Sequence, residues 1–307
     1  MVLWVVAPGC IEYAVGDEDD QYVPPVWVTE AFEQQPAARV DLLWVVDDTA
    51  SMAEEQAALA DGFETFLTSL EASDLSYHVG VVTTEATGEL LGNPWIVTRE
   101  SDDPVGDFAR AVAVGTDGTA DEAGLAAVVT ALGDDLAAGA NRGFRRADAV
   151  LHVIVVSDAD DHSAALLDDP AASVEKLLAD ATTQSGLPAM FSAVVGDEGS
   201  GCSGEFGDAA PGDTYIGVAR NTGGAVASVC AGDLDGILEK LAGLTLAAPD
   251  HVDLQQAPYG DTIRVSVDGT RLDEGWTLEG TTVRFDEAPE LGASIEVSYQ
   301  LAPSEGA

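Results

Sequence analysis

The chain contains 307 residues, enough for one large domain with a small one or for two medium domains. Hydrophobic residues make up 46% of it, which permits a substantial buried core and argues against wholesale disorder. The 55 acidic residues outnumber the 12 basic ones and give a formal net charge of -43, which repels phosphate backbones and anionic lipid headgroups. The composition argues against a nucleic-acid partner and favours cations or partners with basic patches, although most single carboxylates form a solvating coat.

The N-terminal stretch MVLWVVAPGC resembles the end of a bacterial lipoprotein signal, in which a small residue precedes a cysteine that becomes acylated. It departs from that pattern in its short apolar run, in Pro8, and in having no Lys or Arg before the run. We interpret residues 1–10 as a partial lipoprotein-type signal with lipid attachment at Cys10, the alternative being an unremarkable thiol. Lipid attachment implies a cell-envelope location, either periplasmic or surface-exposed.

The other two cysteines, Cys202 and Cys230, are expected to form a disulfide if the lipid anchor is present, because the envelope is an oxidising compartment. No other stretch reaches the roughly 18 apolar residues that a membrane span needs. We therefore expect membrane contact only through an N-terminal lipid.

Residues 11–38, which include GDEDD and VPPVW, are polar and proline-bearing and are interpreted as a tether. Between residues 39 and 246, apolar runs of strand length alternate with stretches of helical spacing. Strands are expected at VDLLWVV (40–46), YHVGVVTT (77–84), AVLHVIVVSD (149–158) and AMFSAVVG (189–196). Helices are expected at 52–70, 121–137, 173–184 and 233–244.

The apolar runs show no alternation, so the strands should be buried on both faces, with the helices as crossovers between them. This pattern predicts an α/β fold with a doubly wound, mainly parallel, Rossmann-like sheet. Ligands of such sheets bind outside the carboxyl ends of the strands. Trp44 and His152 lie inside predicted strands and are expected in the core.

Residues 255–302 change to a period of two, with IRVSV, TVRF and SIEVSY separated by turns. They predict a small antiparallel β module at the C-terminal end of the chain. The module could stiffen a stalk, pack on the main domain or form part of a binding surface, and the sequence does not choose among these.

The sequence VVDDTASM follows the first buried strand and places Asp47, Thr49 and Ser51 at alternate positions before a helix. A carboxylate and two hydroxyls are hard oxygen ligands, suited to Mg²⁺, Mn²⁺ or Ca²⁺. Alternate spacing in a loop that leaves a strand can direct all three side chains toward one centre. The amides at the start of the helix favour an anionic ligand nearby.

This loop resembles the first loop of the metal-ion-dependent adhesion site of von Willebrand A (VWA) domains, which reads Asp-x-Ser-x-Ser. Thr49 replaces the first Ser, and Ala50 replaces the usual Gly. The family adds a Thr from a second loop and an Asp from a third, and GTADEAGL and VIVVSDADD supply Thr119 and Asp158 in the matching places. The stretches VDLLWVVDDTASMAEEQAAL, YHVGVVTTEATG and TGGAVASVC also resemble VWA lipoproteins of delta-proteobacteria, including myxobacteria.

The resemblance implies a VWA fold in which a divalent cation, most readily Mg²⁺, is held by oxygen ligands from three loops. These ligands are Asp47, Thr49, Ser51, Thr119 and Asp158. Hydroxyl ligands add no charge, so the ion stays electrophilic and accepts a carboxylate from a protein partner. Asp160, Asp161 and His162 extend the third loop and either orient waters and contact the partner, or form a solvated acidic loop. The implied function is cation-dependent binding or adhesion at the cell envelope, without catalysis.

Two alternatives come from other functional classes. A metal-dependent hydrolase could use the acidic loop at 158–162, although such sites usually gather several His or carboxylates from separate loops. A phosphoryl-accepting receiver domain also opens with two aspartates after a first strand. It needs a charge-balancing Lys on a late strand, whereas Lys176 and Lys240 both lie in predicted helices.

Overall fold

The computed structural model describes most of the chain, in two compact units that we call the β unit and the α/β unit. The β unit comprises Met1–Pro36 and Ala248–Ala307, and the α/β unit comprises Ala37–Ala247. The described residues are 26–34, 39–72, 75–119, 122–185, 187–204, 207–231, 234–245, 250–290 and 292–302. The lipoprotein-type signal with Cys10 lies outside them. No helix in these ranges is long and apolar enough to cross a membrane.

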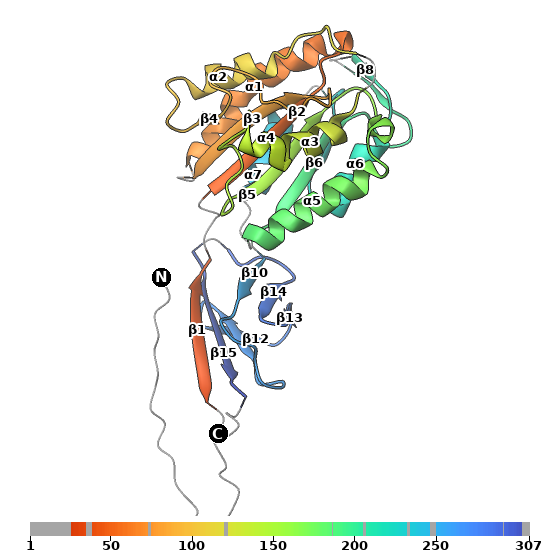
Figure 1. Ribbon diagram of the computed structural model, residues 1–307. Coiled ribbons are helices and arrows are strands. Elements are labelled where there is room, and N and C mark those ends of the chain that lie inside the picture. The colour runs from red at the N-terminus through yellow and green to blue at the C-terminus, as the bar shows by residue number, and fades with distance from the viewer. Residues whose placement is uncertain are drawn as a thin grey trace, which may run out of the picture. The chain divides into compact units, whose positions relative to one another are not determined.

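A six-stranded sheet forms the centre of the α/β unit (Figure 1). Its strands are β2 (Arg39–Val46), β3 (Ser76–Thr83), β4 (Val97–Thr98), β5 (Val150–Val156), β6 (Ala189–Val195) and β9 (Val226–Ser228). They lie in the order β4-β3-β2-β5-β6-β9, and the pairs from β3 to β9 are parallel. The edge strand β4 pairs antiparallel with β3, so the sheet is mixed.

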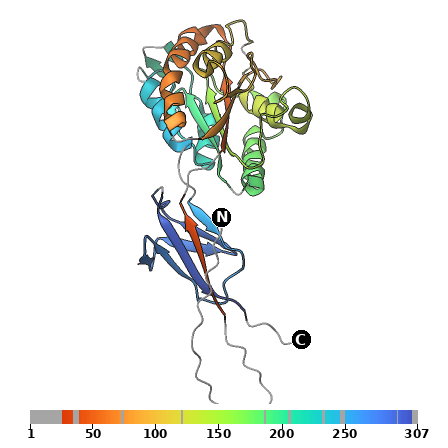
Figure 2. The ribbon, with the colours of Figure 1, turned by 90° about the vertical axis from the view of Figure 1, so that its left-hand side faces the viewer.

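Helices cover both faces of this sheet (Figure 2). On one face lie α1 (Ala53–Ala72), α2 (Pro104–Val112) and α7 (Leu234–Thr245), and on the other lie α3 (Gly124–Leu132), α5 (Pro170–Ser185) and α6 (Asp213–Asn221). The short helices are α4 (Asp134–Ala138), η1 (Ala50–Met52) and η2 (Ser163–Ala165). Along β2, Leu42 and Trp44 face the first layer, and Leu43 and Val45 face the second. Apolar side chains on both faces explain why the strand shows no alternation.

Two core residues expected from the sequence are fully buried. Trp44 packs edge-on against Phe66 and Phe108. His152 Nδ1 lies 2.7 Å from the Thr245 hydroxyl, and its Nε2 lies 2.8 Å from the Ser192 hydroxyl. The Thr245 hydroxyl donates to a backbone carbonyl, so Nδ1 carries the imidazole proton and Nε2 accepts from Ser192. The neutral ring thus ties the end of α7 to the middle of the sheet.

The strand order places a topological switch point between β2 and β5. Counted within this sheet, β2 is the first strand and β5 the fourth, and the spatial order is 3-2-1-4-5-6. The chain leaves the first strand toward one edge and later returns to build the other, so the loops after β2 and β5 diverge. Ligands of open α/β sheets bind in the crevice that this divergence creates.

The β unit contains two antiparallel sheets with a shared core. One has the order β1-β15-β11-β12 and the other β10-β14-β13. The strands are β1 (Trp27–Glu33), β10 (His251–Asp253), β11 (Arg264–Val267), β12 (Thr270–Leu272), β13 (Trp276–Glu279), β14 (Thr282–Phe285) and β15 (Ser294–Gln300). Val265 and Val297 from the first sheet meet Val283 and Phe285 from the second. The period-two pattern of the sequence thus places alternate side chains in this core.

The tether predicted for residues 11–38 is wrong over Trp27–Glu33. This segment is β1, which pairs with β15 along its whole length, from Trp27 opposite Gln300 to Glu33 opposite Ser294. The Tyr299 hydroxyl donates to Glu30 Oε1 over 2.5 Å, so the single buried polar residue of β1 is satisfied within the unit. The β module predicted for 255–302 therefore gains a strand from the other end of the chain, and β10 begins before residue 255.

Candidate functional site

Asp47 stands immediately after β2 and is fully buried at the switch point. Its Oδ1 accepts hydrogen bonds from the Thr49 amide (2.8 Å) and the Thr49 hydroxyl (2.6 Å). Its Oδ2 accepts one from the Ser157 hydroxyl (2.6 Å), which lies just after β5. The two diverging loops are thus joined at one carboxylate, which has about four lone-pair directions and uses three of them here.

A line of hydrogen bonds leads from Asp47 to the third loop. The Thr49 hydroxyl lies 3.3 Å from the Ser51 hydroxyl, and Ser51 in turn bonds the Asp158 side chain. Burial raises the pKa of Asp158, and the charge of Asp47 adds to the rise. Four of the five predicted ligands, namely Asp47, Thr49, Ser51 and Asp158, therefore lie together. Ser51 is exposed, so the outer end of this line is open to solvent.

Thr119, the fifth predicted ligand, does not join this group. It is exposed, and its amide donates to Glu85 Oε1 over 3.3 Å. No hydrogen bond joins it to the other four residues. The second loop instead brings Glu122 to Asp47.

Asp47, Asp48 and Glu122 form a compact acidic group, which we call the three-carboxylate cluster. One carboxylate oxygen from each lies within 4.8 Å of the other two. Glu122 is 1% exposed, and neither of its carboxylate oxygens makes a hydrogen bond of normal geometry to the described chain. Burial raises the pKa of Glu122 to about 7; the Thr84 hydroxyl acts in the opposite direction, and the charges of Asp47 and Asp48 add to the rise. Sequence reasoning missed Glu122 and Asp48 as site residues.

Gly118 allows the first and second loops to approach closely. Its amide donates to the Asp48 carbonyl over 2.9 Å. A Cβ at this position would lie 2.2 Å from Asp48 Oδ1 and 2.7 Å from the Asp48 carbonyl oxygen, so any other residue would push the loops apart. The Gln56 side chain also joins the first loop to the segment before the second, because its Nε2 donates to the backbone carbonyls of Asp47 and Gly115.

The acidic residues that follow Asp158 in the third loop accept hydrogen bonds from the N-terminal turns of two helices. Asp160 accepts from the amide and hydroxyl of Thr214 at the start of α6. Asp161 accepts from the Leu125 amide in the first turn of α3. His162 is exposed, and its amide donates to the Glu122 carbonyl. The carboxylates of Asp160 and Asp161 thus stabilise the N-terminal turns of α6 and α3.

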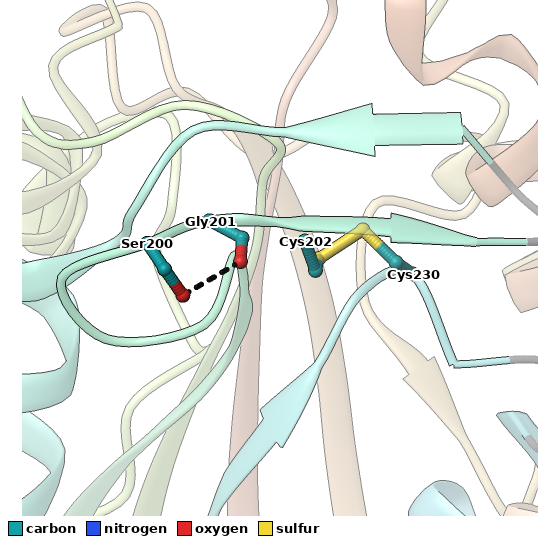
Figure 3. The surroundings of a disulfide bond; sticks show 4 residues. All are labelled: Ser200, Gly201, Cys202 and Cys230. Carbon is teal, nitrogen blue, oxygen red and sulfur yellow. Dashed lines mark hydrogen bonds between the residues drawn. A yellow bond between two sulfur atoms is a disulfide. The ribbon is translucent and has the colours of Figure 1, made fainter.

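The predicted disulfide between Cys202 and Cys230 is confirmed (Figure 3). Cys202 begins β7 (Cys202–Gly204), which pairs with β8 (Gly207–Ala209) to form a hairpin, and Cys230 follows β9. Just past the hairpin, the Ala210 amide donates to the Asp158 carbonyl over 2.8 Å. The bridge therefore fastens the hairpin that borders the third loop.

Comparisons with known proteins give no family assignment. No family model and no curated protein matches the chain. Similar solved structures include a von Willebrand factor type A protein from Catenulispora acidiphila, at 14% identity and a TM-score of 0.46, covering 92% of this chain and 62% of that one. The pilus adhesin SpaC from Lactobacillus rhamnosus GG matches at 13% identity and a TM-score of 0.41, over 89% and 41% of the respective chains.

The pilus adhesin RrgA from Streptococcus pneumoniae matches at 8% identity and a TM-score of 0.39, over 92% of this chain and 59% of that one. This chain spans less than two thirds of the length of each of these three proteins. Likenesses this distant assign neither a family nor an activity. The functional argument therefore rests on the residues of the site.

The site has the charge distribution of a cation-binding centre. Burial raises the pKa of Asp48, Glu55 and Asp158, and the neighbouring charges that act on each are carboxylates, which raise it further. Oxygen atoms without hydrogen-bond partners in the described chain remain on Asp48, Glu55 and Glu122. Buried carboxylates that repel one another are stabilised by a hard divalent cation, so the residues present fit such an ion.

Proposed function

We propose that the α/β unit is a VWA-type domain that binds a protein partner through a divalent cation at the carboxyl edge of its sheet. The hydrogen-bonded line Asp47–Thr49–Ser51–Asp158 at the switch point carries this proposal. We call these four residues the adhesion centre. Two carboxylates and two hydroxyls from separate loops are a ligand set suited to Mg²⁺, with Mn²⁺ or Ca²⁺ as alternatives.

Each residue of the adhesion centre has a distinct task. Asp47 is held in place by Thr49 and Ser157 and gives the centre a rigid inner side. The hydroxyls of Thr49 and Ser51 supply neutral oxygen atoms, and Asp158 closes the centre from the third loop. The bound cation supplies a Lewis acid that attracts a carboxylate of the partner. Ser51 lies at the exposed end of the line, which gives a macromolecule access.

The charge of the chain constrains the partner. A net charge of -43 repels acidic surfaces and nucleic acids, so the partner should present one carboxylate within a basic surrounding. Asp160 and Asp161 stabilise helix N-termini, which favours binding over metal-dependent hydrolysis as the role of this edge. We further propose that lipid attachment at Cys10 holds the protein at the cell envelope.

A pull-down from envelope extracts tests the proposal. The full chain should capture a protein in Mg²⁺ and release it in chelator, and Ser51→Ala should abolish the capture. Ser69→Ala, on the far part of α1, serves as the matched control and should behave as wild type. Equal capture by wild type and Ser51→Ala, or capture that survives chelation, would contradict the proposed function.

A further inference from the structure

The three-carboxylate cluster lies where the first and second loops meet and shares Asp47 with the adhesion centre. Asp48 follows Asp47 directly, and Glu122 stands two residues before α3. Their ligand atoms lie within 4.8 Å of one another, which is a spacing that a single ion can bridge. Gly118 maintains this arrangement, because no Cβ fits beside the Asp48 carboxylate.

Glu122 supplies an independent indication of a ligand. Its side chain is 1% exposed, and both carboxylate oxygens lack a hydrogen bond of normal geometry within the described residues. The hydroxyl of Thr84, which follows β3 and is fully buried, interacts with this carboxylate and lowers its pKa, but not in the geometry of a normal hydrogen bond. A buried carboxylate whose one partner is a poorly aligned hydroxyl costs much free energy, and a cation between it and its neighbours removes that cost.

The number of charges at this edge exceeds what one cation can balance. Asp47, Asp48, Glu122 and Asp158 together carry four negative charges when ionised. A single divalent ion in the adhesion centre would leave two of these charges unbalanced in a largely buried region. A second divalent ion at the cluster balances them.

We propose that Asp47, Asp48 and Glu122 bind a calcium ion at a second site, which shares Asp47 with the adhesion centre. Three carboxylates suit Ca²⁺, which takes six to eight oxygen ligands in flexible geometry, better than Mg²⁺, which usually binds one or two. The Thr84 hydroxyl and water can supply further oxygens. The calcium ion joins the first loop to the second, and the site does not require that a partner protein binds.

Calorimetric titration of the chelated full chain with CaCl₂, in saturating Mg²⁺, tests this proposal. Wild type should bind one Ca²⁺ with a Kd well below about 1 mM. Glu122→Gln and Asp48→Asn should each weaken binding at least about tenfold, because each removes a charged ligand. Glu64→Gln, which changes an exposed carboxylate of α1, should bind Ca²⁺ as wild type does.

Thermal unfolding separates loss of a ligand from misfolding. In chelator, Glu122→Gln should melt above wild type, because the amide relieves repulsion among the carboxylates. At the same calcium concentration, the melting temperature of wild type should rise more than that of Glu122→Gln. If Glu122→Gln does not fold, Asp48→Asn replaces it in both measurements, since Asp48 is only half-buried.

The outcomes distinguish this proposal from the proposed function. Absence of calcium binding in wild type, or unchanged calcium binding in Glu122→Gln and Asp48→Asn, would overturn the second site. Partner capture that persists in Ser51→Ala would overturn the adhesion centre and leave the calcium result standing.

Discussion

The Ser157 hydroxyl donates a 2.6 Å hydrogen bond to Asp47 Oδ2 and so joins the ends of β2 and β5 at the switch point. Both side chains are fully buried. The same hydroxyl accepts from the Ala159 amide, which orients the start of the third loop. One serine thus positions both the inner carboxylate and the loop that carries Asp158.

Ser157→Ala should lower the free energy of unfolding by about 1.5–3 kcal/mol, because a buried carboxylate loses a hydrogen-bond donor. Urea denaturation in chelator measures this loss. Ser69→Ala, whose hydroxyl bonds a helix carbonyl at the surface, is the control and should change stability little. A Ser157→Ala variant as stable as this control would show that the bond does not hold the loops.

Gly118→Ala should destabilise the α/β unit by about 1–3 kcal/mol, because the added methyl group meets the Asp48 carboxylate and backbone. Cation binding should weaken with it, since the second loop moves away from the first. Gly217→Ala in α6 is a matched control, because its Cβ meets no atom within 4 Å. It should be neutral or slightly stabilising. Denaturation midpoints that fall equally in both variants would contradict the close approach.

Acid should destabilise the protein through His152. Burial lowers the pKa of His152 to about 3, whereas the unfolded chain takes up the proton near pH 6.5. Between these values the unfolded state binds more protons, so stability falls as the pH drops. Relative to His152→Gln, wild type should lose about 2 kcal/mol between pH 7 and pH 5. Parallel pH profiles of the two proteins would refute this assignment.

The disulfide should stabilise the α/β unit by about 3.5 kcal/mol, because it closes a loop with a sequence separation of 28 residues. Replacing Cys202 and Cys230 together by Ser should lower the urea midpoint accordingly. Reductant should shift wild type to the same midpoint and leave the double variant unchanged. A reductant effect on the double variant would point to another cause.

The central strands β2, β3, β5 and β6 and the helices α1, α5 and α7 were predictable because each has a long, uninterrupted pattern, whereas β4, β9, α2 and α6 were not predicted. VDLLWVV at 40–46 became β2, and 173–184 became the centre of α5. The helix predicted for 121–137 breaks at Gly133, whose extended backbone separates α3 from α4. Local periodicity indicates which face of a helix is buried, and it does not predict a break at a single extended residue.

β1 could not be recognised from its own sequence. Its only buried residue is Glu30, and the partner that satisfies it, Tyr299, lies 269 positions later in the chain. Because the buried position of β1 is polar, the sequence of this strand does not alternate between apolar and polar residues. A short stretch of sequence does not indicate that it will pair with a strand so far away in the chain.

The sequence indicated which side chains lie together where they follow directly from a strand end, as at Asp47 and Asp158, and their role as metal ligands stays a prediction. In the second loop, sequence spacing favoured the hydroxyl of Thr119, whereas the fold turns Glu122 inward. The acidic doublet at Asp47 and Asp48 was the one available signal for a more anionic cluster. The close contact between the two loops at Gly118 is a tertiary feature that residue spacing does not predict.

The α/β unit is inserted into the β unit, since β1 precedes it and β10 follows it. Two separate peptide connections therefore attach it, one between Glu33 and Arg39 and one between Thr245 and His251. After a proteolytic nick in the first connection, the second still holds the α/β unit, and the β1–β15 ladder retains the severed N-terminal segment. Release of the α/β unit by proteolysis thus requires both connections to be cut.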